Sequence, residues 1–88
     1  MDKAIENFKG AIEKKKGKAS PFKIANAFNN LAIALFEAGE PEEAMYNYNE
    51  AIRLEPSPCY FNNRGLAHYH QGRLEDAYED FTLALDKQ

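Results

Sequence analysis

The chain has 88 residues and a net charge of −3, so it fits one small domain or one short array of repeats. Ala is the commonest residue, with 13 copies, whereas Val is absent and Thr occurs once, and this balance favours an all-α fold. The longest uncharged apolar run, residues 31–36, is too short to span a membrane. The single cysteine, Cys59, excludes an internal disulfide and suits a reducing compartment, and no basic-then-apolar leader opens the chain. We therefore expect an intracellular protein of the cytoplasm with no membrane partner.

Residues 1–16 are the first predicted helix, and residues 17–20 are a Lys-rich loop after it. Within the helix, Ala4, Phe8 and Ala11 follow steps of four and three residues that recur in two later helices. The segment is therefore predicted to be the second helix of a hairpin whose first helix is missing.

Two helices follow, near residues 21–38 and 41–54. Ser20 stands as an N-cap before Pro21, whose missing N–H costs nothing at the first helical position. Gly39 stands where the first of these helices would end in a left-handed C-cap.

The same punctuation predicts two more helices, near residues 58–71 and 74–86. Ser57 precedes Pro58, and Gly72 separates the two helices. The turns within each pair are very short, which forces antiparallel hairpins.

These two pairs of helices repeat each other at an offset of 33 residues, which places Phe28 over Phe61. The same offset pairs Asn29 and Asn30 with Asn62 and Asn63, Ala34 with Ala67, Gly39 with Gly72, Ala44 with Ala77, Tyr48 with Phe81, and Ala51 with Ala84. We therefore predict one domain of residues 1–88 with five helices. It consists of the half unit, a first repeat at residues 21–56 and a second repeat at residues 57–88.

The pattern resembles the tetratricopeptide repeat (TPR) superfamily, whose units read W-x2-L-G-x2-Y, then A-x3-F, then P. The first unit here reads F-x2-L-A-x2-L, then A-x3-Y, then P, and the second reads F-x2-R-G-x2-H, then A-x3-F. Arg64 and His68 depart from the usual apolar choices and predict a more polar seam in the second unit. The residues that carry the resemblance are Phe28, Leu31, Ala32, Gly39, Ala44, Tyr48, Ala51, Pro56, Phe61, Gly65, Gly72, Ala77, Phe81 and Ala84.

The resemblance implies a right-handed α-solenoid of antiparallel helical hairpins that acts as a non-catalytic scaffold for a protein or peptide. In this family the first helices of successive repeats line a concave groove. Carried over position by position, the groove would be lined by Asn26, Asn29, Asn30, Ile33, Phe36, Glu37, Cys59, Asn62, Asn63, Leu66, Tyr69 and His70.

Asparagine is abundant on this predicted lining. A carboxamide both donates and accepts, so it can bind the N–H and C=O groups of an extended peptide. The alternative is that Asn30 and Asn63 only bond neighbouring helices.

Self-assembly is the alternative function. Tyr78 and Leu85 have no following helix to cover them, and Ile5 and Ile12 lack the partner helix of their own hairpin. These exposed ends predict a weak, concentration-dependent homo-oligomer.

An adaptor for the acidic tails of heat-shock chaperones is less favoured. That clamp needs Lys and Asn on the first unit and Asn on the second. Asn63 matches, but Asn29 and Ile33 stand where Lys and Asn are needed.

Charge is distributed unevenly along the chain. Residues 9–23 carry six Lys against one Glu, whereas the rest carries five basic and thirteen acidic residues. Nucleic acid is therefore not expected as a partner. The run Lys14–Lys18 is compatible with a nuclear-import or anionic-surface signal, but we prefer to interpret it as a solvated insertion.

Catalysis, cofactors and metal ions are not expected, because no nucleophile, phosphate-binding loop or pair of catalytic carboxylates emerges. His68 and His70 lie about 200° apart around a helix and cannot chelate one metal. We expect His68 to pack between helices and Cys59 to be a small half-buried residue. A solvated acidic face is expected for Glu75, Asp76, Glu79 and Asp80.

Overall fold

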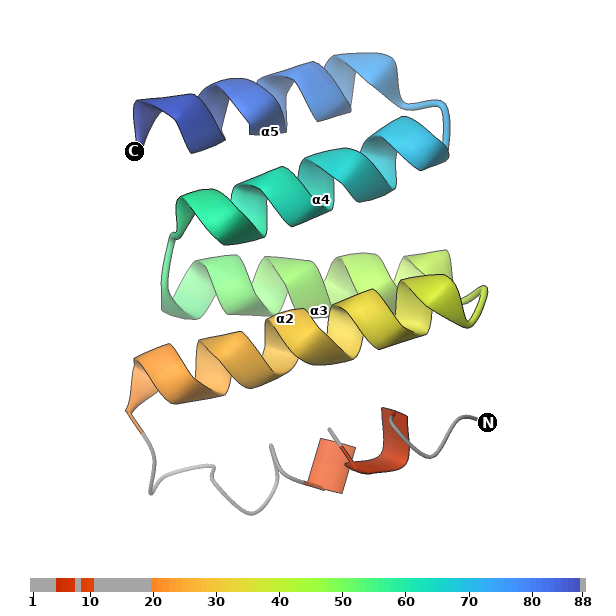
Figure 1. Ribbon diagram of the computed structural model, residues 1–88, viewed down its shortest axis with the longest axis vertical. Coiled ribbons are helices and arrows are strands. Elements are labelled where there is room, and N and C mark those ends of the chain that lie inside the picture. The colour runs from red at the N-terminus through yellow and green to blue at the C-terminus, as the bar shows by residue number, and fades with distance from the viewer. Residues whose placement is uncertain (1–4, 8, 11–19, 88) are drawn as a thin grey trace.

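The computed structural model describes residues 5–7, 9–10 and 20–87 (Figure 1). Its helices in this part are α2 (Pro21–Glu37), α3 (Pro41–Leu54), α4 (Pro58–His70) and α5 (Leu74–Asp86). Residues 5–7 and 9–10 are also helical, within the first predicted helix. The remainder of that helix and the run Lys14–Lys18 lie outside the described residues. No strand occurs in the described ranges, and the prediction of an all-α fold of helical hairpins is confirmed.

The first hairpin begins and ends at the residues that the sequence marks. The Ser20 Oγ accepts a hydrogen bond from the Lys23 N–H at 3.4 Å, and Pro21 is the first helical residue. At the other end, Gly39 has a φ of +85°, and the Glu40 N–H donates to the Leu35 carbonyl at 2.9 Å. This closure leaves α2 one residue shorter than predicted.

The second hairpin repeats this design with one difference. Gly72 has a φ of +79°, and the Arg73 N–H donates to the His68 carbonyl at 2.9 Å. Ser57 occupies the N-cap in an extended conformation, but its side chain makes no capping hydrogen bond. Its carbonyl instead accepts from the N–H groups of Tyr60 and Phe61.

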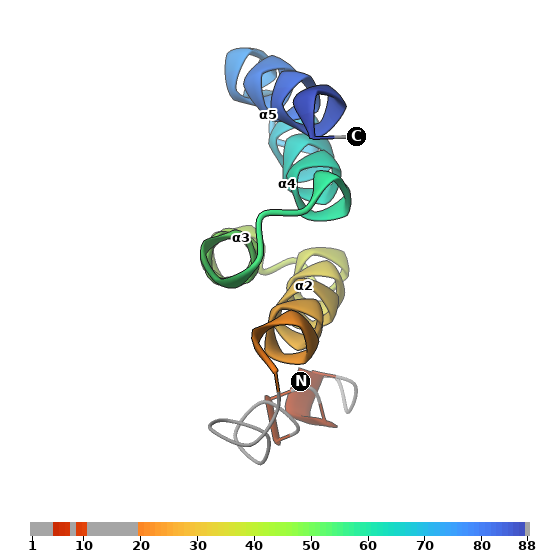
Figure 2. The ribbon, with the colours of Figure 1, turned by 90° about the vertical axis from the view of Figure 1, so that its left-hand side faces the viewer.

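The helices form a stack in chain order, with consecutive helices antiparallel (Figure 1). Seen from the side, α2 and α4 both lie to one side of α3 (Figure 2). The fold measures 36 × 28 × 14 Å, and its shortest dimension is close to the diameter of one helix, about 10–12 Å. In so thin a layer, α2 and α4 share a face that no described helix covers (Figure 2).

An apolar seam holds the first hairpin together. Leu31 and Leu35 of α2 are buried against Ala44 and Tyr48 of α3, and Ile5 of the N-terminal segment joins the same cluster. Each fully buried leucine contributes about 1.5–3 kcal/mol.

A second cluster seats α4 on the first hairpin. Tyr60 of α4 is buried against Ala25 of α2 and Ala51 of α3. Ile52 and Leu54 pack against the edge of this cluster. The two alanines have small side chains, which leaves room for the tyrosine ring between α4 and the earlier helices.

An ion pair joins α4 to α5 in the second hairpin, at the position where a leucine packs α2 against α3 in the first. Arg64 stands at the position of Leu31 and donates two hydrogen bonds to Asp80, from Nε at 2.8 Å and from Nη2 at 2.7 Å. Its Nη1 donates to Asn49 Oδ1 of α3 at 2.7 Å. Asp80 is only 3% exposed, so our expectation of a solvated acidic face is wrong for this residue. The 33-residue offset places it over Asn47, which is also buried, so this position faces inward in both units.

His68 completes this polar seam at the position of Leu35. Its Nε2 lies 3.6 Å from Asp80 Oδ2, and its side chain is 13% exposed. Its Nδ1 is buried without a hydrogen-bond partner among the described residues. The expectation that His68 packs between helices is confirmed, as is the polar character of the second seam.

Gly65 is required by the close approach of α4 and α5. A Cβ atom at this position would lie 2.8 Å from Phe81 Cε1 and 3.2 Å from Asp80 Cβ. Contacts this short force a shift of the ring, so a methyl group does not fit here without rearrangement.

Candidate partner-binding groove

A hollow of about 340 Å³ lies between α2 and α4 on their shared open face. We call it the α2–α4 hollow. It is lined by Ile33, Phe36, Glu37, Tyr48, Asn63, Leu66, Ala67 and His70.

Aromatic and aliphatic side chains form most of its wall. The Phe36 and His70 rings lie 6.1 Å apart at a tilt of 42°, and Tyr69 meets His70 edge-on at 5.8 Å. Leu66 is 44% exposed and Tyr69 is 57% exposed, so two large apolar side chains of α4 face solvent at or beside the hollow. Exposed apolar groups around a concave surface are typical of binding sites.

Glu37 is the charged carboxylate of the lining, which contains no Lys or Arg. Burial, and then the nearby charge of Glu37, raises the pKa of Tyr48 to about 12. The negative charge of Glu37 is therefore felt at Tyr48, which lines the same hollow.

The structure brings together six residues of the predicted groove. Its lining adds Tyr48 and Ala67, which the groove prediction did not include. In the sequence, Tyr48 and Ala67 stand out only as members of the repeat pattern. The predicted residues that line the hollow are Ile33, Phe36, Glu37, Asn63, Leu66 and His70.

The asparagines divide between helix packing and the surface. Asn29 is 4% exposed, and its Oδ1 accepts a hydrogen bond from Asn63 Nδ2 at 3.2 Å. Asn63 therefore bonds a neighbouring helix, as the alternative interpretation holds, while it also lines the hollow. Asn30 is half-buried and Asn26 is exposed, and neither lines the hollow.

Cys59 and Asn62 lie instead at a second hollow of about 450 Å³ on the outer side of α4 and α5. Cys59 is exposed, so the expectation that it is half-buried is wrong. No described helix packs over this part of α4. The remaining lining residues are Pro58, Phe81, Ala84 and Leu85.

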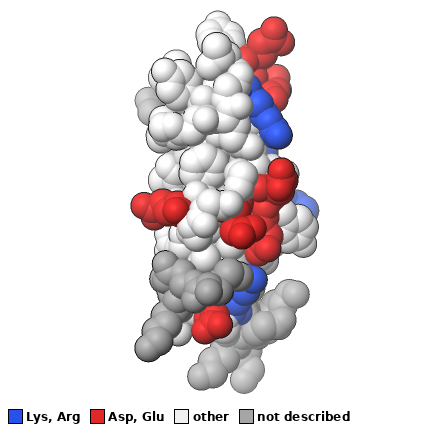
Figure 3. Space-filling view, turned by 90° about the vertical axis from the view of Figure 1, so that its right-hand side faces the viewer, with Lys and Arg blue, Asp and Glu red and all other residues white. Residues whose placement is uncertain are grey.

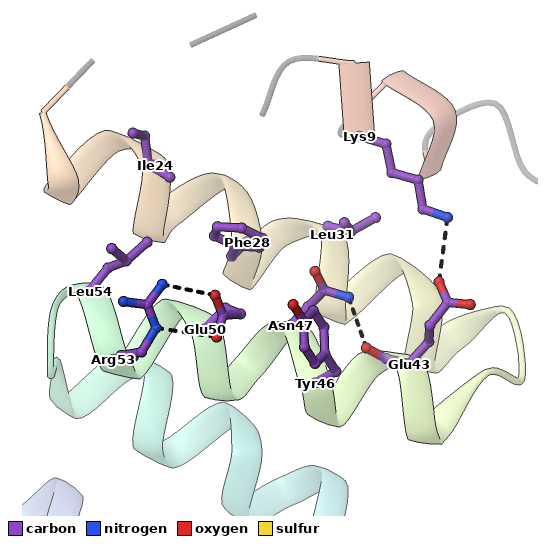
Figure 4. Close-up of a pocket in the computed structure, with 10 residues that line it drawn as sticks. All are labelled: Lys9, Ile24, Phe28, Leu31, Glu43, Tyr46, Asn47, Glu50, Arg53 and Leu54. Atoms are coloured by element: carbon purple, nitrogen blue, oxygen red, sulfur yellow. Dashed lines mark hydrogen bonds and ion pairs between the residues drawn. The ribbon is translucent and has the colours of Figure 1, made fainter. Parts of the chain in front are cut away.

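A third hollow, of about 480 Å³, lies on the side of the first hairpin that faces Lys9 (Figure 4). Phe28 and Leu31 of α2 form its apolar floor, and Lys9 reaches across to Glu43 at 3.4 Å. At the equivalent place in the second unit, Arg64 bonds to α3. This hollow is therefore part of the junction with the N-terminal segment and not of the open face between α2 and α4.

Many charged side chains lie toward one edge of the face drawn in Figure 3, an acidic group protrudes at the opposite edge, and much of the remaining described surface there is uncharged. Within the described residues, no cluster of His, Cys, Asp and Glu could hold a metal ion. No helix in the described ranges is both long and apolar enough to cross a membrane.

The stacked hairpins and the open face between their first helices define a helical-repeat domain. Models of the tetratricopeptide repeat match residues 25–58 and 58–88. The chain belongs to the tetratricopeptide repeat superfamily, whose repeats generally mediate protein–protein interactions and are typically non-catalytic.

Two curated proteins show the same similarity. A TPR repeat-containing protein of Methanocaldococcus jannaschii is 36% identical over 87 residues, which is 98% of this chain and 14% of that protein. NADPH oxidase activator 1 of Rattus norvegicus is 32% identical over 63 residues, which is 70% of this chain and 14% of that protein. The chain thus spans about one seventh of the length of each relative.

Proposed function

We propose that this chain is a non-catalytic interaction module that binds a peptide segment of a partner protein in the α2–α4 hollow. One observation carries the proposal: the hollow joins the first helices of both repeats and is walled by Phe36, Leu66 and His70. An extended segment lying across it would contact both repeats at once. The carboxamide of Asn63 could then reach the backbone of the segment.

Binding to a peptide library tests the proposal. The probe is a mixture of heptapeptides, Ala-Xaa-Xaa-Leu-Xaa-Xaa-Ala, passed over the immobilised chain, and the strongest binders are resynthesised and measured by calorimetry. Leu66→Ala removes most of an apolar wall side chain without adding a charge and should weaken binding about tenfold, as expected for a central apolar contact.

Leu74→Ala is the matched control. Leu74 is 59% exposed at the start of α5 and does not line the hollow, so this change should leave binding intact. Equal losses for Leu66→Ala and Leu74→Ala would show that the peptides bind by general hydrophobicity. If no peptide binds the unchanged chain more tightly than the Leu66→Ala variant, the groove proposal is wrong.

An acidic chaperone tail suits this hollow poorly. Residues 20–87 hold five Lys and Arg against eleven Asp and Glu, and the only charged carboxylate of the lining is Glu37. Two of the basic side chains, Arg53 and Arg64, are already paired with acidic residues. A carboxylate-rich peptide would meet repulsion instead of a clamp.

Self-assembly is a second candidate function, favoured by the outer face of α4 and α5. Tyr78 is 74% exposed and Leu85 is 69% exposed on α5. At the 33-residue offset, Ala84 and Leu85 correspond to Ala51 and Ile52, which contact Tyr60 where α4 sits on the first hairpin. This face therefore repeats the surface that already holds a helix, and a helix of a second copy would fit it.

Light scattering behind size exclusion, run over a wide range of concentration, tests self-assembly. The apparent mass should rise with concentration, and Leu85→Glu should return it to the monomer value. A constant monomer mass for the unchanged chain would rule this function out.

A further inference from the structure

We propose that the α2–α4 hollow selects a basic residue of its partner, so that the bound segment carries Arg or Lys next to an apolar side chain. This inference rests on the proposed function and adds the chemistry of the ligand. It is argued from the charge, the position and the aromatic neighbours of Glu37.

The lining of the α2–α4 hollow contains one acidic residue, Glu37, and no Lys or Arg. Glu37 supplies a carboxylate, and it forms no ion pair with any described Lys or Arg. A carboxylate beside an apolar wall interacts strongly with a cation that displaces water from it. An arginine side chain could lay its aliphatic stem along Ile33 and Leu66 and turn its guanidinium to Glu37.

The position of Glu37 is unfavourable for the helix that carries it. It is the last residue of α2, where the helix dipole disfavours negative charge, and α2 has no basic residue in its last turn. The same carboxylate acts to keep the Tyr48 hydroxyl protonated. No described contact compensates for placing the acid here, which agrees with a role in binding.

The aromatic rings next to Glu37 also suit a cation. Phe36 precedes it in α2, and its ring packs against His70 across the hollow. Ring faces attract guanidinium and ammonium groups, most strongly where water is excluded. An Arg of the partner can therefore meet a carboxylate and an aromatic face within one hollow.

The peptide library described above provides the test, with sequence composition as its readout. Arg and Lys should be enriched over Asp and Glu at one Xaa position among the peptides that the unchanged chain retains. Replacing that Arg by norleucine in a resynthesised peptide should raise Kd about tenfold, the size expected for one charge-assisted contact. Glu37→Gln should abolish this difference between the two peptides.

Glu42→Gln is the matched control. Glu42 is exposed in the first turn of α3 and does not line the hollow, so the Arg preference should persist. Glu37→Gln removes an unfavourable charge from a helix end, so it should not unfold the chain, and circular dichroism checks this directly.

The outcomes separate the two proposals. If Leu66→Ala weakens peptide binding but basic residues are not enriched, or the Arg preference survives Glu37→Gln, the selection of a basic residue is wrong and the groove remains. If acidic residues are enriched instead, the charge argument is overturned. If no peptide binds the unchanged chain more tightly than the Leu66→Ala variant, both proposals fail.

Discussion

The two hairpins end their first helices at the same kind of glycine turn, but different chemistry fills the space between their helices. In the first, Leu31 and Leu35 pack into an apolar cluster with α3. In the second, Arg64 and His68 take those positions and meet the buried Asp80. Apolar packing is tolerant of partners, whereas a bidentate ion pair requires one carboxylate at one place. The second seam therefore depends on the pairing of Arg64 with Asp80. Leu66 and His70, on the same helix as Arg64, line the α2–α4 hollow instead.

The ion pair gives the largest expected difference between the hairpins. Arg64→Met would leave the Asp80 carboxylate, which is 3% exposed, without its bidentate partner. Removing one member of a buried pair costs about 3–5 kcal/mol, so urea unfolding should show a loss of that order. The matched change Leu31→Met in the first hairpin keeps volume and polarity and should cost less than about 1.5 kcal/mol.

The control for the Arg64→Met variant is to replace the polar residues of the second seam by those of the first. The triple change Arg64→Leu, His68→Leu and Asp80→Asn installs the residues of the first hairpin in the second. Replacing a buried ion pair by apolar groups is often neutral or stabilising by about 1–4 kcal/mol, so this variant should match or exceed the parent. If Arg64→Met loses no more stability than Leu31→Met, the ion pair does not hold α4 to α5.

Tyr48 should make the first hairpin sensitive to alkaline pH, because its counterpart Phe81 in the second hairpin cannot ionise. Its pKa is raised to about 12 in the fold, against about 10 in an unfolded chain. The folded-state pKa is the higher one, so the stabilisation is complete below pH 10 and is lost as the pH rises toward about 12. Between these values the parent should lose about 2 kcal/mol more than Tyr48→Phe, measured as unfolding free energy against pH. Parallel curves for the two proteins would contradict the raised pKa.

Exchange of Gly and Ala should destabilise both hairpins, by overpacking in the second and by loss of a buried methyl group in the first. Gly65→Ala places a Cβ atom within 2.8 Å of the Phe81 ring, so overpacking should outweigh the better helix propensity of Ala and cost about 1–2 kcal/mol. Ala32, the counterpart in the first hairpin, is fully buried with its methyl group in contact, so Ala32→Gly should also destabilise, by about 1 kcal/mol or more. Thermal melts of both variants check this. A more stable Gly65→Ala protein would show that α4 and α5 are not in this close register.

The helix caps give the smallest difference. Ser20 bonds the first turn of α2 through its side chain, whereas Ser57 makes no such bond to α4. Ser20→Ala should therefore cost about 0.5–1 kcal/mol, and Ser57→Ala only a few tenths. Equal melting temperatures for the two variants would remove this distinction between the hairpins.

The helices and turns were predictable because their signals are local. Pro21 and Pro58 begin helices at the predicted residues, and Gly39 and Gly72 take the predicted left-handed conformation. A left-handed φ or a missing N–H constrains the backbone wherever the residue occurs. The predicted ends of α2, α3, α4 and α5 accordingly agree with the structure to within one residue.

The polar seam was only partly predictable, because its members lie on different helices. Arg64 and Asp80 are 16 residues apart, and the four acidic residues near the start of α5 look alike in sequence. One signal was present: at the 33-residue offset, Asn47 becomes Asp80 in the same unit in which Leu31 becomes Arg64. When one repeat has an acidic residue and a basic residue at two positions that are uncharged in the other repeat, an ion pair between them is indicated. That comparison would have separated Asp80 from its solvated neighbours.

Sequence could indicate which residues share a face of α2 and α4, but not how their side chains contact each other. Helical spacing placed Asn29 and Asn63 on the lining, but it could not show that Asn63 bonds Asn29, because that contact depends on how α4 packs over α2. For the same reason, spacing did not show that Tyr48 reaches the floor of the hollow from α3.

Nuclear magnetic resonance of the full chain tests the central claim most directly, by comparing the open face of α2 and α4 with the outer face of α5. A selected Arg-containing heptapeptide is titrated into the labelled protein, and changes in amide chemical shift are followed residue by residue. The groove account predicts the largest saturable changes at Ile33, Glu37, Leu66 and His70, with Tyr78 and Leu85 nearly unchanged. The largest changes at Tyr78 and Leu85, with the α2–α4 hollow unaffected, would contradict it.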